Sequence, residues 1–332
     1  THIEVRHEDY DLVCPSDYMA ERMIKDGLVQ KVNTEIFDTF DADLFYDGLA
    51  EMISPFDKNN EYFVPYIWGT FGIMYDVNKI DAGSDAMKSW SALWSQDYNK
   101  HILMKDSVRD AYSVARIYGN RDKLSELSDG FTDYNEAYRA ELVKYFSEID
   151  QTLVNEAKTT LLQQRPVLLK YEVDDGKNDM LAGTTEAWLG LFWSCDSGLI
   201  MQEDGGDHFY YEVPKEGSNV WVDGWLIPAY SANPDAANYF LKFIYMHEYA
   251  RINYDYLGNT LAVKSVMDEV KAELESDEDG FFADTYDGFK QMYIDMMFPS
   301  ESVLARCGVM RDFGKAMNTA LDSMWIDVRA GH

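Results

Sequence analysis

The sequence has few of the residues that build disulfide frameworks and metal sites. Its three cysteines, Cys14, Cys195 and Cys307, are an odd number at wide spacings, so they specify neither a disulfide framework nor a zinc site. The six histidines are scattered and show no metal-ligand spacing. We therefore expect neither a metal site nor a cofactor, and the cysteines give no indication of the compartment.

Positive charge is also scarce. The chain has 29 lysines and arginines against 59 aspartates and glutamates, a formal net charge of −30. Such a charge repels a phosphate backbone, which argues against nucleic acid as a partner, whereas it attracts small cations. Most of these acids are expected to form a solvated surface, because a cation site needs only a few of them.

Long apolar runs are missing too. No stretch approaches the roughly 20 apolar residues that span a bilayer, and the first residues do not form a signal peptide. The chain does have length and apolar content, with 332 residues of which 46% are hydrophobic and 14% aromatic. This is enough material for two hydrophobic cores, so we expect two lobes and little disorder.

Strand-like and helical patterns alternate along the chain, which predicts βα units and a largely parallel sheet. The first unit is a strand at 10–14 followed by a helix that Ser16 begins and Gly27 ends. Residues 119–165 are expected to be mainly helical, and a helix is predicted to begin near Val108. Further strands are expected at 102–104, 167–172, 188–193, 209–213 and 220–228.

Two segments give more specific predictions. Residues 63–75 are rich in aromatic and β-branched residues, but Gly69 and Gly72 interrupt them, which predicts two strands around a close backbone approach. A helix after Asn233 is predicted to bury a stripe of large side chains. This stripe consists of Tyr239, Phe240, Phe243 and Ile244.

Aromatic residues and carboxylates occur in pairs that suit an organic cation. Trp221 and Asp223 project the same way from an extended segment, and Trp193 precedes Asp196 by three residues. An ammonium group is held both by a carboxylate and by the negative face of an aromatic ring. The structural alternative is a buried indole beside a surface acid, because tryptophan is usually buried.

The candidate residues lie where the predicted fold places ligands. In open α/β sheets ligands bind beyond the carboxyl ends of strands, where loops lead into helices. Ser16 and Tyr18 follow one predicted strand, residues 106–110 a second, and residues 194–196 a third. Since Trp221 and Asp223 lie at the expected crossover between lobes, all these groups are expected to face a cleft.

Residues 10–30, YDLVCPSDYMAERMIKDGLVQ, resemble the corresponding stretch of the polyamine-binding proteins, the solute receptors of spermidine/putrescine ABC transporters. Collinear matches continue over nearly the whole chain. They include Pro65–Thr70, Ser89–Trp90, Asp106–Asp110, Trp193–Asp196, Val220–Asp223 and Trp325 with Val328–Gly331.

The resemblance implies an α/β, bilobal periplasmic-binding-protein fold of type II, with two mixed sheets flanked by helices and joined by hinge crossovers. Lobe one would comprise residues 1–75 and 227–290, and lobe two residues 76–226. Residues 291–332 would form C-terminal helices packed across or onto the lobes. Family members open with a strand and an aromatic, acidic motif that this sequence lacks, so we expect the first strand of lobe one and one wall of the cleft to be missing.

The resemblance also implies a polyamine ligand, of the putrescine or spermidine class, in an interlobe cleft. Asp223 would pair with one amine and Asp110 with another, while Trp221 and Trp193 would stack against the methylene chain. The other implied ligand contacts are Ser16, Tyr18, Asp106, Ser107, Asp196 and Asn259. An aliphatic amine suits these aromatic walls better than a compact metal ion, which needs a shell of oxygen ligands.

The implied partners are the polyamine and an ABC permease, with the chain itself a monomer and not an enzyme. Its place would be extracytoplasmic, as a periplasmic protein, a lipoprotein or a domain fused to a permease. One alternative is a carboxylate-based glycoside hydrolase using Asp110, Asp196 and Asp223, although no nucleophile motif, phosphate loop or metal triad accompanies them. Another alternative is a ligand-free sensor or interaction module on the same fold.

Overall fold

The computed structural model describes residues 9–39, 43–46, 48–173 and 175–331, and the chain divides into two compact units. Unit 1 consists of residues 1–69, 221–278 and 309–312, and unit 2 of residues 70–220, 279–308 and 313–332. The chain leaves unit 1 after residue 69 and re-enters it at residue 221, before the expected boundaries at 75 and 226. Both crossings lie inside strands, β2 (Val64–Asp76) and β7 (Ser218–Trp225).

Unit 2 is built on a mixed sheet with the order β4-β3-β5-β2-β7-β9, and β6 pairs with β2. The remaining strands of this sheet are β3 (Ile102–Lys105), β4 (Leu168–Glu172), β5 (Leu189–Trp193), β6 (Phe209–Glu212) and β9 (Cys307–Gly308). Strand β3 is parallel to β4 and β5, as βα units predict, whereas β2 is antiparallel to β5 and β6. The sheet is therefore mixed and not largely parallel.

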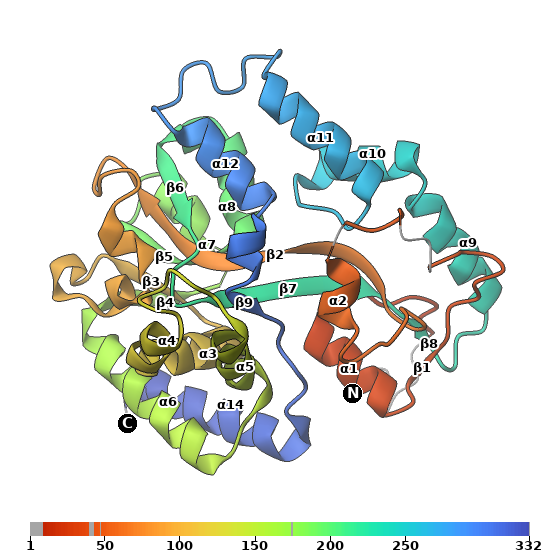
Figure 1. The fold of residues 1–332 in the computed structure, drawn as a ribbon, viewed down its shortest axis with the longest axis horizontal. Helices are drawn as coiled ribbons and strands as arrows, with labels where there is room; N and C mark the ends of the chain where they lie inside the picture. The colour runs from red at the N-terminus through yellow and green to blue at the C-terminus, as the bar shows by residue number, and fades with distance from the viewer. Residues whose placement is uncertain (1–8, 40–42, 47, 174, 332) are drawn as a thin grey trace. The chain divides into compact units, whose positions relative to one another are not determined.

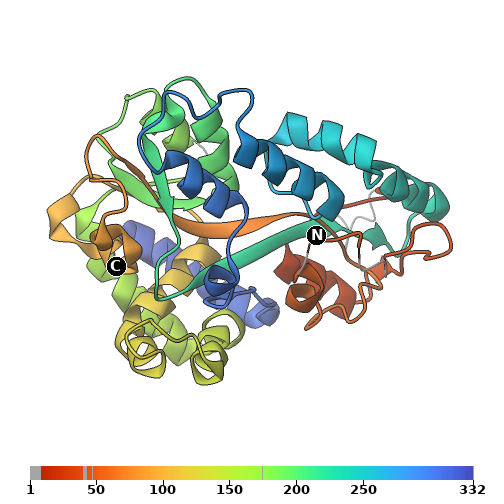
Figure 2. The ribbon, with the colours of Figure 1, turned by 45° about the horizontal axis from the view of Figure 1, so that its top comes forward.

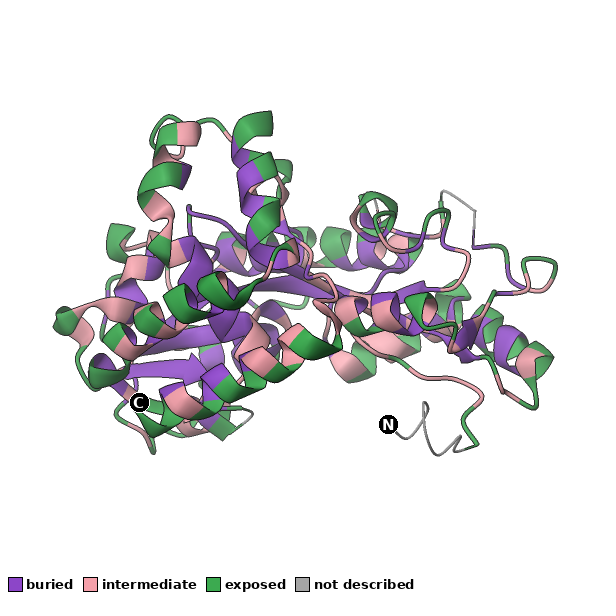
Figure 3. Ribbon diagram, turned by 90° about the horizontal axis from the view of Figure 1, so that it is seen from below, coloured by how far each residue is buried: buried purple, intermediate pink, exposed green. Residues whose placement is uncertain are grey.

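Helices cover both faces of this sheet. Figure 1 shows α3 (Val108–Gly119), α6 (Gln151–Gln164) and α14 (Gly314–Ala330) on one side, and α8 (Ser194–Gln202) and α12 (Phe289–Met297) on the other. Figure 3 shows the strands as a continuous buried layer between helices with exposed outer surfaces. The other α-helices described in this unit are α4 (Arg121–Leu127), α5 (Glu136–Ser147), α7 (Asp175–Leu181) and α13 (Glu301–Leu304).

Residues 63–75 differ from the prediction of two strands, because β2 runs without a break from Val64 to Asp76. The close backbone approach is nevertheless present at Gly72. A Cβ atom there would lie 2.4 Å from the carbonyl oxygen of Glu212 on the neighbouring strand β6. Glycine at this position therefore lets two strands pair closely and does not end the strand.

Unit 1 contains shorter pairings. Strand β1 (Val29–Gln30) pairs antiparallel with β8 (Ile227–Pro228), and single bridges join Val13 to Leu226 and Ile67 to Leu261. The expected strand at 10–14 is reduced to the Val13 bridge. The helix predicted next to it is present as α1 (Asp17–Lys25), with Ser16 as its N-cap and Gly27 at φ +65° just beyond its end. A short helix, α2, spans Leu49–Ile53.

Three consecutive helices complete unit 1, namely α9 (Pro234–Ile244), α10 (His247–Leu257) and α11 (Lys264–Ser276) (Figure 2). The prediction for the buried face of α9 is wrong. Tyr239, Phe240 and Phe243 are 61%, 48% and 44% exposed. Instead Ala237 and Leu241, one turn apart, face the core together with Asn238, so the helix is rotated away from the position that its largest side chains suggest.

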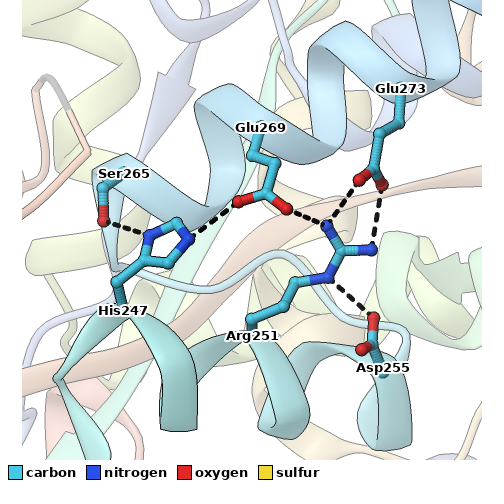
Figure 4. Close-up of polar contacts among 6 residues, drawn as sticks. All are labelled: His247, Arg251, Asp255, Ser265, Glu269 and Glu273. Carbon is cyan, nitrogen blue, oxygen red and sulfur yellow. Dashed lines mark hydrogen bonds and ion pairs between the residues drawn. The ribbon is translucent and has the colours of Figure 1, made fainter.

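Charged side chains join α10 to α11 (Figure 4). Arg251 donates hydrogen bonds to Glu269 and Glu273 on α11 and to Asp255 on its own helix, at 2.7–2.9 Å. His247 Nε2 lies 2.7 Å from Glu269, and its Nδ1 lies 3.0 Å from Ser265 Oγ. Several partners share these charges, so the network fixes the pairing of the two helices better than an isolated surface ion pair would.

Candidate ligand-binding site

In unit 1 the start of α1 is joined to β7 by three successive contacts. Gly224 donates its backbone N–H to the Pro15 carbonyl, Ser16 forms a bridge with Asp223, and Val222 donates its N–H to Asp17 Oδ2 at 3.2 Å. Asp17 is 1% exposed. The sequence places Ser16 and Asp223 far apart in the chain, and the fold brings them together.

The period of two along β7 arranges the aromatic and acidic candidates. Trp221, Asp223 and Trp225 alternate with buried neighbours and form one half-buried row on this strand. Trp225 was not among the predicted site residues, although the same alternation would have indicated it. Its ring lies 5.3 Å from that of Tyr66, and its indole N–H is buried without a hydrogen-bond partner among the described residues.

The carboxylate of Asp223 is poorly compensated. Burial raises its pKa above the ordinary value, and only the hydrogen bond with Ser16 opposes this shift. No lysine or arginine in the described part of the chain forms an ion pair with it. Asp223 therefore has capacity for an incoming cation.

The other two candidates in unit 1 lie at helix ends. Tyr18 is half-buried in the first turn of α1, where its backbone N–H donates to Asp17 Oδ1 at 2.6 Å. Asn259 follows Gly258, which caps α10 at φ +64°. The side-chain oxygen of Asn259 is buried and accepts no hydrogen bond from a described residue.

In unit 2 the fold brings Ser107, Asp110 and Trp193 together. Helix α3 begins at Val108, as predicted, with Ser107 as its N-cap and Asp110 in its first turn, while Trp193 ends β5. The side chains of Ser107 and Trp193 both lie close enough to the Asp110 carboxylate to lower its pKa. Parallel pairing of β3 and β5 explains the meeting, because both strands end at the same edge of the sheet.

Asp110 is 6% exposed, and its Oδ2 atom has no hydrogen-bond partner in the described part of the chain. Burial raises its pKa to about 6, against the opposing effects of Ser107, Lys105, Trp193 and Arg109. A carboxylate in this position is costly to ionise unless a cation arrives. This unsatisfied oxygen is the strongest sign of a ligand site in unit 2.

Lys105 is a buried lysine that the sequence analysis did not single out. It is 1% exposed at the end of β3, and its ammonium lies 4.1 Å from the centre of the Trp193 ring. The same ammonium contacts Asp196 Oδ2 at 2.9 Å and Glu172 Oε1 at 3.8 Å. The signal in the sequence was a charged residue directly after the apolar run Ile102–Met104.

Two of the predicted carboxylates already have cationic partners. Lys105 and Lys177 bind the two oxygens of Asp196 at 2.9 and 2.6 Å. Asp106 accepts a hydrogen bond from the Trp325 indole and pairs with Arg329, both at 2.8 Å, and so holds α14 against the end of β3. Within the described residues, Asp110 and Asp223 are therefore the predicted acids that keep unsatisfied capacity.

A family model of bacterial extracellular solute-binding proteins matches residues 6–282, which is most of the chain. The chain belongs to this family. The family consists of solute-binding transport proteins and is not a family of enzymes. The predicted resemblance to polyamine receptors is confirmed by the relatives described next.

The spermidine/putrescine-binding periplasmic protein of Escherichia coli K12 is 28% identical over 243 residues, which cover 73% of this chain and 60% of the relative. The putrescine-binding periplasmic protein SpuD of Pseudomonas aeruginosa is 22% identical over 335 residues, covering 97% of this chain and 79% of the relative. The chain thus spans about 60% of the length of the first of these relatives.

Solved structures confirm the predicted fold class. The spermidine/putrescine ABC transporter substrate-binding protein PotD of Streptococcus pneumoniae superimposes with a TM-score of 0.70 at 19% identity, covering 99% of this chain and 86% of that one. The Tp0655 lipoprotein of Treponema pallidum gives 0.68 at 20% identity, covering 97% and 85%. In the part of the chain that the structure describes, no helix combines the length and the apolar character needed to cross a bilayer.

Proposed function

We propose that this protein binds a polyamine and delivers it to an ABC permease on the outer side of the cytoplasmic membrane. The observation that carries the proposal is the buried Oδ2 of Asp110, which has no partner among the described residues. An ammonium group would supply the missing partner and the missing charge at once. The relatives named for binding spermidine and putrescine, and their periplasmic names, support the same assignment.

The uncompensated acids indicate the sign of the charge that the ligand carries. Asp106 and Asp196 are occupied by arginine and lysine side chains, whereas Asp110 and Asp223 are not. A primary amine keeps its charge at neutral pH, because its pKa resembles the value of about 10.4 for lysine. Each unit therefore offers one such acid, Asp223 in unit 1 and Asp110 in unit 2, to a protonated amine, which supports an amine ligand.

The two tryptophans have different roles in this proposal. Trp193 has Lys105 against its ring and lies close enough to Asp110 to lower its pKa, so its proposed role is to hold the carboxylate in place. Trp221 lies in the half-buried row of β7 with Asp223 and is proposed to pack on the methylene chain. Burial of each methylene contributes about 0.8 kcal/mol, and a cation–π contact contributes about 0.5–2 kcal/mol.

The test is isothermal titration of the purified chain with putrescine, spermidine and butylamine. We expect 1:1 binding of putrescine that weakens at least about 30-fold in Asp110→Asn and in Asp223→Asn, because each substitution removes one partner of a desolvated charge pair. Asp122→Asn is the matched control, since the Asp122 side chain is 91% exposed. Absence of heat with every amine, or equal loss of affinity in the control, would contradict the proposal.

A further inference from the structure

A second concave region lies wholly within unit 2. It is a pocket of about 200 Å³ between the free edge of β6 and the helices α12 and α13. Its charged lining residues are Glu212 on β6, Asp295 on α12 and Arg306 after α13. None of the residues that line it belongs to the proposed polyamine site.

Opposite charges line this pocket without pairing. Glu212 makes no ion pair or side-chain hydrogen bond within the described ranges, although Arg306 is close enough to act on it electrostatically. Burial raises the pKa of Glu212, Arg306 and Lys88 lower it, and the neighbouring Asp295 raises it, with a net upward shift.

Arg306 has hydrogen-bond donors to spare. Its guanidinium donates to the carbonyls of Val213 at 3.1 Å and Ser302 at 3.5 Å, and its Nε–H has no partner in the described part of the chain. A guanidinium offers five N–H donors. The pocket is therefore lined by a carboxylate, Glu212, and a guanidinium, Arg306, that form no ion pair with a described residue.

The rest of the lining suits a short hydrocarbon segment. Tyr211, Met292 and Met296 are buried side chains that line the same space, and the thioether of Met292 accepts the outward N–H of Tyr211 at 3.4 Å. At about 30 Å³ per water-sized group, 200 Å³ holds roughly six or seven heavy atoms.

We propose that this pocket binds a small amino acid zwitterion, with its ammonium group toward Glu212 and Asp295 and its carboxylate toward Arg306. Each end of such a molecule matches an unused group of the opposite charge, and its short carbon chain matches the thioether and aromatic walls. The inference does not depend on the proposed polyamine site, since the two sites share no residue.

The experiment is NMR of the full chain with ¹³C-labelled methionine methyl groups, assigned with Met292→Leu and Met296→Leu. β-Alanine is titrated at constant ionic strength, and propylamine and propionate serve as its amine-only and acid-only counterparts. We expect saturable shifts of the Met292 and Met296 signals with β-alanine and at least about tenfold weaker effects with either counterpart, because each of them leaves one charge unpaired. Glu212→Gln should abolish the shifts, whereas Glu301→Gln, an exposed acid on α13, should preserve them.

Three results would overturn the inference. The first is that the Met292 and Met296 signals do not move up to about 20 mM β-alanine, well above the millimolar affinity expected of a small ligand. The second is that propylamine binds as tightly as β-alanine. The third is that Glu212→Gln binds β-alanine as well as the wild type does. A thermal unfolding scan of Glu212→Gln shows whether the variant is folded. Repeating the β-alanine titration with Asp110→Asn separates this pocket from the polyamine site, because the Met292 and Met296 shifts should persist in that variant.

Discussion

The ammonium of Lys105 lies 4.1 Å from the centre of the Trp193 ring and 2.9 Å from Asp196 Oδ2. In unit 2 the ammonium of Lys105 thus takes the place, between an indole and a carboxylate, that the sequence analysis predicted for the ammonium of a ligand. The internal lysine pairs with Asp196, whereas Asp110 keeps a buried oxygen, Oδ2, without a hydrogen-bond partner among the described residues.

Replacing this lysine should destabilise the protein strongly. Lys105→Met removes the ion-pair partner of the buried Glu172 and leaves Asp196 with Lys177 alone, and breaking a buried pair in this way costs about 3–5 kcal/mol. Urea unfolding measures the loss. Lys170→Met is the control, because the Lys170–Asp179 pair is largely exposed and should contribute at most about 1 kcal/mol. Similar losses in both variants would show that burial of Lys105 is not what matters.

Asp110→Asn should stabilise the protein without ligand at high pH. The folded pKa of Asp110 is about 6, above its ordinary value of 3.8, so the folded state holds the proton more tightly. Relative to the variant, the wild type therefore loses stability as pH rises from about 4 to above 6, by up to about 3 kcal/mol. Urea unfolding of the wild type and the variant across this pH range tests the direction of this change in stability. A variant that is less stable than wild type above pH 6 would show that Asp110 supports the fold.

Glu21→Gln should show the opposite pH dependence. Burial raises the pKa of Glu21, but hydrogen bonds from Arg311, from the Asp312 N–H and from Lys25 outweigh it, so the net shift is downward. The stability that the carboxylate contributes is present above its unfolded pKa and is lost as pH falls through the folded value. We expect a cost of about 2–3 kcal/mol at neutral pH that shrinks below about pH 4. Glu35→Gln, which replaces an exposed acid, should leave the stability unchanged both at neutral pH and below about pH 4.

Arg251→Met should loosen α11 from α10. The substitution removes the guanidinium that Glu269, Glu273 and Asp255 share, and amide hydrogen exchange in α11 should become faster. The difference from wild type should shrink at high salt, because these groups are partly exposed to solvent. Lys242→Met, at an exposed position on α9, serves as the control for loss of a surface cation. Unchanged α11 exchange would mean that apolar contacts alone hold the helices.

The elements that could be predicted from the sequence are those with local signals. Ser107 marks the start of α3, and the apolar run before Ser194 marks β5, because capping and hydrophobic continuity depend on neighbouring residues. The partners of Asp106 and Asp196 could not be predicted in this way. Trp325 is 219 residues from Asp106, and Lys105 is 91 residues from Asp196. Such pairs depend on how distant segments pack, and the sequence alone does not report that.

The outward-facing aromatic side chains of α9 have a practical consequence for anyone preparing this protein. Tyr239, Phe240 and Phe243 give solvent a set of rings on one helix, and surfaces of this kind adsorb to hydrophobic resins, bind amphiphilic dyes and promote precipitation at high concentration. Because these rings do not contribute to the buried side of α9, exchanging them for lysine or glutamate should make samples easier to concentrate while leaving the core intact.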